Sequence, residues 1–560
     1  MAQRRDTAWL RRELAVAATC CAVTISAAGI PSAWAQSTQP RASDPAAGSQ
    51  TQEQSAQGTE ARKQDSQAKS GKSAKTQAKS SSKSSAPQVP GLSAADAAQL
   101  AALEASPARF DKTLGPRIWD IPFPSYGDTI LQDAGGWRSK LAEYGIGLIA
   151  WNVSIFQSNL LNGPSVIPNY AYAPSAGAFL PYPKCGRNPS AICAGGQAYL
   201  GQQPFGTTDS YATLTYDMNQ WGIPDAQIVV GGMFILSSND AFLKDGWTTV
   251  TNLIWNQSFY NKTFEVKLGL MPLNQEFVGV FVGGNFANSF GPSASIPAEL
   301  GLGMPNGVPA AMVKWNITDK FYNQFAVGRS QPVNGPTGNP FYDEAYLNPN
   351  GFRMVPPGTG ALIIDEVGYK AKATPTELST WVRAGGIWNF SDFKDLRNLT
   401  SAETVGGSGG VYFLVDQQIW QQAPGSIFTA HRGIYAGFSA MYAPPEVAAF
   451  SQYYEGRLYW IGPFDNRPTD MISFVYAHNE VSKYLADGIN QIAKDYQPFT
   501  DYILPFANYS TNSYTLTYLA HLMPGLYASV GVSYTDNPSI QTFQGQGSAL
   551  SFLGSITTVF

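Results

Sequence analysis

The feature of this sequence that most limits its fold is a long series of strand-length segments in which apolar and polar residues alternate. The series begins after Pro116 and runs to the end of the chain, with turn residues between its members. No apolar run reaches the roughly 20 residues that a membrane-spanning helix needs. Sixteen segments can be counted, an even number, as in single-chain bacterial barrels. The pattern therefore predicts an all-β fold, a transmembrane antiparallel β-barrel of about 16 strands.

The expected strands are Gly145–Ser158, Ser210–Met218, Ala226–Ser237, Thr248–Phe259, Thr263–Pro272, Val308–Thr318, Lys320–Arg329, Gly360–Lys370, Glu377–Phe390, Gly410–Trp420, Thr429–Tyr442, Phe450–Ile461, Asp470–Val481, Asn512–Leu522, Leu526–Asp536 and Ala549–Phe560.

The composition suits such a barrel. Charged residues make up 14% of the chain and aromatic residues 13%, whereas about 25% of a typical soluble protein is charged. A barrel has this mixture because only alternate residues of each strand face lipid. The net charge of −4 and the absence of a basic stripe with interleaved aromatic residues give no reason to expect nucleic acid as a partner.

Alternation also predicts which way side chains face. Phe264, Val266 and Leu268 are expected to face lipid, and within 149–155 the odd-numbered residues are expected to do the same. A charge facing lipid at mid-depth would cost ~2–4 kcal/mol, so charged strand residues are expected to face the lumen. The expected lumen-facing residues are Lys267, Lys314, Arg383, Asp416, Glu455 and Arg457.

The connections between strands alternate in length. Those at 316–320 and 523–525 are tight, while those at 159–209, 273–307, 330–359 and 482–511 are long. Outer-membrane barrels have short periplasmic turns and long outer loops. This parity places all four long links outside and both ends of the barrel in the periplasm.

The third outer loop is expected to fold into the barrel, narrow the pore and, with Arg383 and Arg457, set its selectivity. An exposed surface loop is the alternative. Side chains that form several hydrogen bonds suit a site for a polar solute. The loop offers candidates for such a site, namely Asn274, Gln275, Glu276, Asn285 and Asn288.

The first part of the chain has the pattern of an exported protein. Residues 1–35 have a basic start, an apolar stretch and a small-x-small cleavage site at Ala33-Trp34-Ala35, as a signal peptide does. Residues 36–91 are rich in Ser, Gln, Lys and Ala and are expected to be a disordered tail, either a solvated linker or a tether on the anionic cell wall. Residues 92–129 are expected to form a short helix, capped by Ser93, and a linker. The barrel domain is placed at 130–560.

The cysteines and histidines indicate structural roles. Cys20 and Cys21 lie in the signal peptide, and Cys185 and Cys193 are expected to form a disulfide in the first outer loop. The three histidines fall on distant strands, and Asp365 and Glu366 point to opposite faces of one strand. We therefore expect no enzyme activity, no cofactor and no metal.

Five motifs follow one another along the barrel domain. At 135–146 the chain reads GGWRSKLAEYGI. The later motifs are Lys267–Met271, His431–Phe438, Asn466–Asp470 and Asn537-Pro538. In this order they resemble the motifs of the carbohydrate-selective porin (OprB) family, although in the first motif the Trp here follows the glycines. The resemblance spans about Ile130 to Phe560.

This resemblance implies a passive, monosaccharide-preferring channel, often trimeric, in the outer membrane of a Gram-negative bacterium. Its expected partners are small sugars, outer-membrane lipid and lipopolysaccharide, and the barrel-assembly machinery, which would recognise the terminal Phe560. A general or anion-preferring porin and a structural anchor of the envelope are the alternative functions.

Overall fold

The structure is a computed structural model. It describes residues 93–118, 124–161, 170–173, 178–181, 199, 201–238, 246–283, 288–292, 296–303, 306–335, 340–399, 401, 403–496, 506–542 and 547–560. The expected signal peptide, the tail at 36–91 and the pair Cys185 and Cys193 lie outside these residues.

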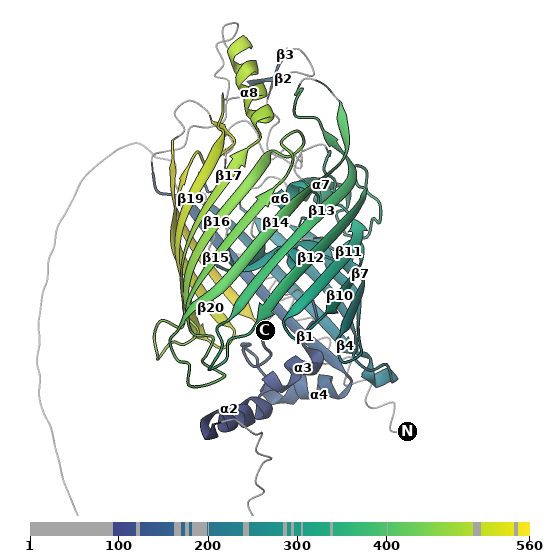
Figure 1. The fold of residues 1–560 in the computed structure, drawn as a ribbon, viewed down its shortest axis with the longest axis vertical. Coiled ribbons are helices and arrows are strands. Elements are labelled where there is room, and N and C mark those ends of the chain that lie inside the picture. Colours follow the sequence, from purple (N-terminus) through teal and green to yellow (C-terminus); the bar gives the residue numbers. More distant parts are fainter. Residues whose placement is uncertain are drawn as a thin grey trace, which may run out of the picture.

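Sixteen strands form a closed antiparallel barrel, which Figure 1 shows from the side. Each strand pairs with its neighbours in chain order, and the first closes the ring against the last, with Trp151 opposite Val559. The barrel strands are β1 (Ile146–Asn159), β4 (Phe205–Asp217), β5 (Ala226–Ser237), β6 (Trp247–Phe259), β7 (Phe264–Met271), β10 (Val308–Asn316), β11 (Phe321–Arg329), β12 (Ala361–Ala371), β13 (Thr380–Lys394), β14 (Thr404–Gln421), β15 (Gly433–Tyr442), β16 (Phe450–Ile461), β17 (Met471–Val481), β19 (Ser510–Met523), β20 (Leu526–Asp536) and β22 (Ala549–Val559).

Each of these strands overlaps one of the sixteen expected from the sequence, so the predicted fold is confirmed. We call the end of the barrel that carries the short connections, such as 317–320 and 524–525, the turn end, and the opposite end the loop end. The N-terminal helices lie at the turn end, beside the last residue (Figure 1).

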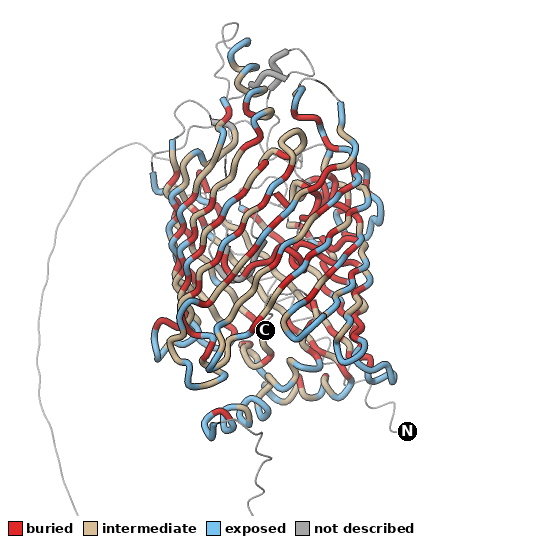
Figure 2. The backbone as a smooth tube through the Cα atoms, in the orientation of Figure 1, coloured by how far each residue is buried: buried red, intermediate tan, exposed pale blue. Residues whose placement is uncertain are grey.

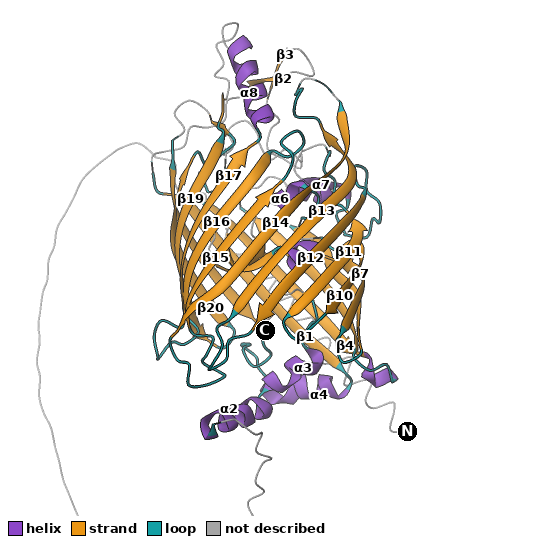
Figure 3. Cartoon of the chain, in the orientation of Figure 1, coloured by secondary structure: helices purple, strands orange, loops and turns teal. Residues whose placement is uncertain are grey.

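The remaining described elements lie in the connections and before the barrel. The helices are α2 (Ala94–Ala105), α3 (Asp111–Leu114), α4 (Trp137–Glu143), α5 (Leu273–Phe277), α6 (Ile296–Glu299), α7 (Pro340–Leu347) and α8 (Lys483–Tyr496). Three two-stranded sheets join β2 (Tyr170–Ala173) to β3 (Ala178–Pro181), β8 (Gly279–Gly283) to β9 (Asn288–Pro292), and β18 (Phe506–Ala507) to β21 (Gln541–Thr542). In Figure 3, α6 and α7 lie behind the front strands, and α8 stands above the loop end. None of the described helices is both long and apolar enough to cross a membrane.

The burial pattern of the strands is the reverse of that in a soluble protein. On β16, Leu458 is 50% exposed whereas its neighbour Arg457 is 3% exposed. On β12, Val367 is 55% exposed and Glu366 is fully buried. Large apolar side chains thus cover the outside while charged ones are buried inside, and Figure 2 shows this alternation along the strands. A wall of this kind suits lipid on its outer face.

The expected facing of β1 is wrong. Ser154 lies opposite Ile556, which is 54% exposed on the outer surface, so the even-numbered residues of β1 face outward. Ile149 faces inward and is fully buried, in a cluster that includes Leu114 of α3. An apolar face can pack on lipid or on another part of the protein, and alternation alone does not distinguish the two.

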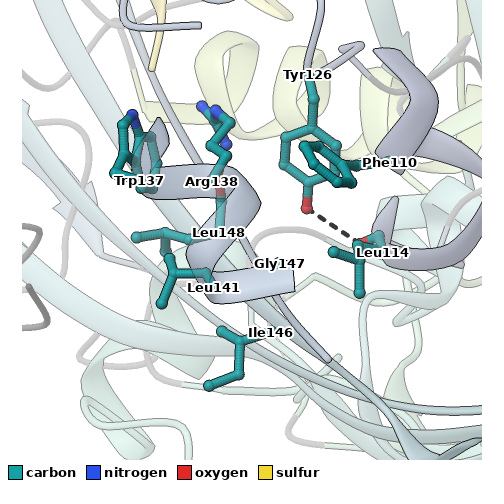
Figure 4. A pocket seen from close by; sticks show the side chains of 9 residues that line it. All are labelled: Phe110, Leu114, Tyr126, Trp137, Arg138, Leu141, Ile146, Gly147 and Leu148. Atoms are coloured by element: carbon teal, nitrogen blue, oxygen red, sulfur yellow. Dashed lines mark hydrogen bonds between the residues drawn. The ribbon is translucent and has the colours of Figure 1, made fainter. Parts of the chain in front are cut away.

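The segment before β1 is attached to the turn end by Arg138, which is 4% exposed. Its guanidinium donates to the backbone oxygens of Gln132 and Leu148, and it lies over the rings of Trp137 and Tyr126 at 4.3 and 4.9 Å. Figure 4 shows these side chains around a small cavity, with the Tyr126 hydroxyl donating to Leu114. The Arg side chain therefore holds the GGWR segment against the first strand.

A second attachment joins Asp128 to the turn between β19 and β20. Its carboxylate contacts His521 Nε2 at 3.0 Å and accepts from the Gly525 backbone at 2.8 Å and from the Tyr527 hydroxyl. Burial alone would raise the pKa of Asp128, but these hydrogen bonds outweigh burial and hold that pKa below its ordinary value.

Candidate functional site

The connection between β7 and β10, residues 272–307 and here called loop 3, begins by turning into the barrel. All five residues of α5 are buried. Lys267 Nζ on β7 lies 2.7 Å from both carboxylate oxygens of Glu276, and Gln324 on β11 donates to the Glu276 backbone oxygen at 2.9 Å. An ion pair and a wall-to-backbone hydrogen bond therefore hold the first turn of loop 3 against the inner wall.

Loop 3 then crosses to the opposite wall. Val282 of β8 packs in a buried cluster with Tyr435, Tyr459, Met471 and Val475, which lie on β15, β16 and β17. Seven strand steps separate β7 from β16 in the ring of sixteen. The described part of loop 3 therefore lies inside the barrel and reaches across its lumen.

The end of loop 3 is attached at the loop end of the barrel. Glu299 of α6 accepts from the Phe450 backbone at the start of β16, and Asn389 of β13 donates to the Leu300 oxygen at 2.9 Å. Burial raises the pKa of Glu299 to about 8, against the hydrogen bonds from the backbone. A protonated carboxyl at neutral pH lowers the cost of this buried contact.

Arg383 connects the wall to the first part of loop 3, just after α5. Its guanidinium donates to the backbone oxygens of Phe277, at 3.0 Å, and Gly279, and lies 3.7 Å from the centre of the Trp381 ring. The side chain is 2% exposed. The guanidinium thus donates hydrogen bonds to two carbonyl groups between α5 and β8. Its several donors in one plane allow both bonds at once, which a neutral side chain of similar size would not match.

Arg457 belongs to a second buried cluster, which lies in the wall itself. It pairs with Glu455 at 2.5 Å and Asp416 at 3.2 Å and donates to Ser439 at 2.6 Å. Tyr459 donates to Asp416 at 3.1 Å. One cation and two carboxylates so close together, with hydroxyl groups around them, stabilise three adjacent strands across their inner faces.

The sequence did not indicate a second insertion, α7, in the connection between β11 and β12. Arg329 at the end of β11 pairs with Glu344 of α7 at 2.7 Å, and both are buried. Ala345 packs in a cluster with Met233 and Trp247 of the neighbouring wall. The adjacent carboxylates Asp343-Glu344, following an Arg at a strand end, are the signal that could have pointed to it.

The residues expected to line the pore whose side chains the structure describes are inward, but most are enclosed by protein. Lys267, Arg383, Asp416, Glu455 and Arg457 are at most 8% exposed, and Asn274, Gln275 and Glu276 are at most 4% exposed. Lys314 is half-buried, 4.4 Å from the centre of the Tyr322 ring. Asn285 lies outside the described residues, and the side chain of Asn288 on β9 is not described. Contact of these residues with a solute stays a prediction.

We call the wall formed by β7 and β10–β16, with loop 3, the filled side, and the wall formed by β19, β20 and β22 the hydroxyl side. On the hydroxyl side the inward residues are mostly Ser and Thr. Some of these hydroxyl groups pair across strands, as Thr515 and Ser533 do at 2.8 Å and Ser529 and Ser555 at 2.6 Å. The inward hydroxyl residues that are half-buried are Thr535, Ser555 and Thr557, and those at most 7% exposed are Ser513, Thr515, Thr517, Ser529, Ser533 and Ser551.

The comparison with known families decides the family. A model of the carbohydrate-selective porin, OprB family, matches residues 193–553. The chain belongs to the carbohydrate-selective porin (OprB) family. No curated protein matches the chain. The family and the barrel fold are those of channels without enzymatic activity.

Among solved structures, a high-pH structure of Pseudomonas putida OprB has a TM-score of 0.60, with 18% identity over 77% of this chain and 98% of that one. A low-pH structure of the same protein has a TM-score of 0.44 at 16% identity, covering 79% of this chain and 100% of that one. At this identity the first of them supports the porin fold alone.

The OprB motifs of this chain have a physical basis in the structure. Gly269 and Gly433 have φ angles of +136° and +144°, and an added Cβ would lie 1.9 Å from a backbone oxygen of the neighbouring strand. Only Gly fits both conditions. In the later motif, Arg467 pairs with Asp470 across a turn and donates to the His521 oxygen. The motifs thus mark close strand contacts and turns rather than solute contacts.

Proposed function

We propose that this OprB-family chain lets small neutral sugars diffuse through the outer membrane, past the constriction that loop 3 makes. The observation that carries the proposal is the pairing of a lumen-spanning loop with an uncharged wall rich in Ser and Thr. Thr535, Ser555 and Thr557 are the half-buried hydroxyl residues of this wall. Their hydroxyl groups both donate and accept hydrogen bonds, so they can replace the water around a sugar. Each such bond is weak, which lets the solute leave again.

Liposome swelling with purified protein tests this proposal. We expect monosaccharides to enter faster than disaccharides and faster than charged monosaccharides of the same size. A general porin would sort solutes by size alone, and an anion-preferring porin would pass the acidic sugar first. Either of these results would replace the proposed function.

In this proposal the charged residues predicted to grip the sugar act mainly on the loop. Glu276 and Arg383 are bonded to loop 3 or belong to it, so they set its position and, through it, the width of the pore. Glu276→Ala is then expected to raise ion conductance and to weaken discrimination between sugars. Glu265→Gln is the matched control, because Glu265 lies on the same inner face but bonds to Asn316 instead.

The outer-membrane setting gives an orientation. The turn end faces the periplasm, where residues 36–91 would reach the cell wall, and the outer surface contacts lipid and lipopolysaccharide. Phe560 pairs with Ala150 through both backbone groups, and we infer that this closing strand is the one that the barrel-assembly machinery recognises. Deletion of 36–91 is expected to leave sugar uptake unchanged. Deletion of Phe560 is expected to reduce assembled barrel.

We also propose that the barrel forms a homotrimer through the outer faces of β1 and β4. At mid-strand, Asn152 donates to Ser210 at 2.8 Å, and Ser154 contacts Asn152 and Thr208 at 3.1 Å. Such polar groups fit a protein neighbour better than lipid. The double variant Asn152→Leu, Ser210→Leu is expected to be a monomer by native mass spectrometry. Its single-channel conductance per barrel is expected to be unchanged.

The disulfide between Cys185 and Cys193 is part of the proposal as well. Two cysteines close together in an exported chain favour a bridge. Mass spectrometry of the non-reduced protein is expected to find the cross-linked peptide, and free thiols at both positions would exclude it.

A further inference from the structure

The inner face of β1 and β4 carries a pair of aromatic rings that none of the roles above uses. Trp151 and Tyr211 are opposite each other in the register, and their rings stack with centroids 4.8 Å apart and planes 10° apart. Both face inward, because Tyr211 pairs with the buried Met233 and packs in the cluster that includes Ala345 of α7. The stacked pair therefore lies between the hydroxyl side and the part of the wall, β5 and β6, that α7 contacts.

A carboxylate lies next to this pair on the same face. Asp209 is two residues from Tyr211 on β4, which is about 7 Å along the strand. It accepts a hydrogen bond from Thr207 at 3.3 Å, and none of the ion pairs among the described residues includes it. This sets Asp209 apart from Glu276, Asp416 and Glu455, each of which pairs with a cation.

The registers place the groups around Val153. Thr557 of β22 lies opposite Val153 on one side, and Asp209 of β4 lies opposite it on the other. Two inter-strand steps make about 10 Å between the backbones of Thr557 and Asp209. Val153 thus lies between Thr557 and Asp209, and the Trp151–Tyr211 pair borders these three residues toward the turn end. We call this group of five residues the seat.

We propose that this seat is a binding subsite for one monosaccharide ring on its way through the pore. The proposal rests on the proposed function. The apolar C–H face of a sugar packs on an aromatic ring, and an ionised carboxylate accepts hydrogen bonds from two neighbouring hydroxyl groups. Thr557 adds a hydroxyl from the hydroxyl side. No carboxylate faces the lumen from the described strands β19, β20 and β22, because Asp536 of β20 lies in the outward register, two residues from the exposed Tyr534.

The subsite assigns different parts of the sugar to different residues. Asp209 takes vicinal hydroxyls and would repel an anionic sugar, whereas Trp151 contacts the ring face whatever the hydroxyl pattern. A solute that is neutral and has adjacent equatorial hydroxyls fits best.

Block of single-channel ion current by a neutral monosaccharide tests the subsite. Asp209→Asn and Trp151→Ala are each expected to raise the half-blocking concentration several-fold, and Trp151→Phe less. Two variants serve as controls: Glu265→Gln removes another inward carboxylate, and Trp315→Ala removes an exposed outward ring. Their half-blocking concentrations are expected to equal that of wild type. The migration of heated and unheated samples on denaturing gels shows whether each variant forms a heat-resistant barrel.

The outcomes separate the two proposals. If wild type shows neither sugar block nor sugar-driven swelling, the proposed function fails. If wild type is blocked and both Asp209→Asn and Trp151→Ala are blocked equally well, the subsite is wrong and the function stands. If Asp209→Asn changes cation selectivity but not sugar block, Asp209 serves cations and the subsite is also wrong.

Discussion

The filled side and the hydroxyl side of the lumen solve the same problem in opposite ways. Every inner wall of a barrel must satisfy polar side chains that point away from lipid. The filled side does so with ions and tyrosines that bind one another and loop 3, as Arg457 does with Glu455 and Asp416. The hydroxyl side does so with small neutral groups paired across strands, such as Thr515 and Ser533. The first arrangement supports a structure, and the second leaves groups able to exchange partners.

The comparison predicts that stability depends mainly on the filled side. Arg457→Ala would leave two buried carboxylates unpaired, at a cost of about 3–5 kcal/mol. We expect a clear loss in the free energy of unfolding, measured by urea titration in lipid vesicles. Arg397→Ala is the control, because the Arg397 side chain is 54% exposed in its pair with Asp395. Equal stabilities for the two variants would mean that the cluster around Arg457 does not support the barrel.

A pH effect on loop 3 is expected to be intermediate. The pKa of Glu299 is about 8 in the folded protein, above its ordinary value of 4.5. Between pH 4.5 and pH 8 the folded protein therefore keeps a proton on Glu299 that the unfolded chain has released. The contribution of Glu299 to stability therefore falls as pH rises from about 4.5 to about 8 and stays low above that.

We expect noisier single-channel current at pH 9 than at pH 6, as the attachment of α6 to Phe450 weakens. Glu299→Gln should remove the difference, since an amide does not ionise. If the noise of the single-channel current rises with pH in Glu299→Gln as well, a group other than Glu299 causes the effect.

The smallest effect is expected on the hydroxyl side. Ser555→Ala removes one hydrogen bond between neutral groups, which is worth about 1 kcal/mol. Ser555 is half-buried, so its hydroxyl group can meet a solute. We expect a loss of about 1 kcal/mol in the free energy of unfolding and a modest fall in the rate of monosaccharide entry by liposome swelling. A loss as large as that of Arg457→Ala would show that the two sides do not differ as described.

How much the sequence revealed differs between these regions. Strand positions followed from alternation, because a barrel wall must keep apolar residues on one face, as Leu458 and Arg457 show. Alternation gives the face of a residue but not what covers that face. The burial of Arg383 under loop 3 and the inward facing of Ile149 therefore needed the fold. The helix α7 was missed because eight residues are too few to show a helical repeat.

The expectation that loop 3 would enter the lumen came from the parity of the connections and from its place as the third outer loop. The residues that hold it there act through contacts with distant strands, such as Asn389 with Leu300. No local pattern reports such contacts, because the partners are far apart in the sequence.

We propose that loop 3, held across the lumen, makes the channel distinguish sugars. The test is liposome swelling with a monosaccharide and with a disaccharide. It compares wild type with a variant in which a short Gly-Ser linker replaces residues 276–299. We predict that wild type favours the monosaccharide strongly, and that the variant passes both at nearly the ratio of their free diffusion. An unchanged ratio of the two rates in a correctly folded variant would contradict the claim.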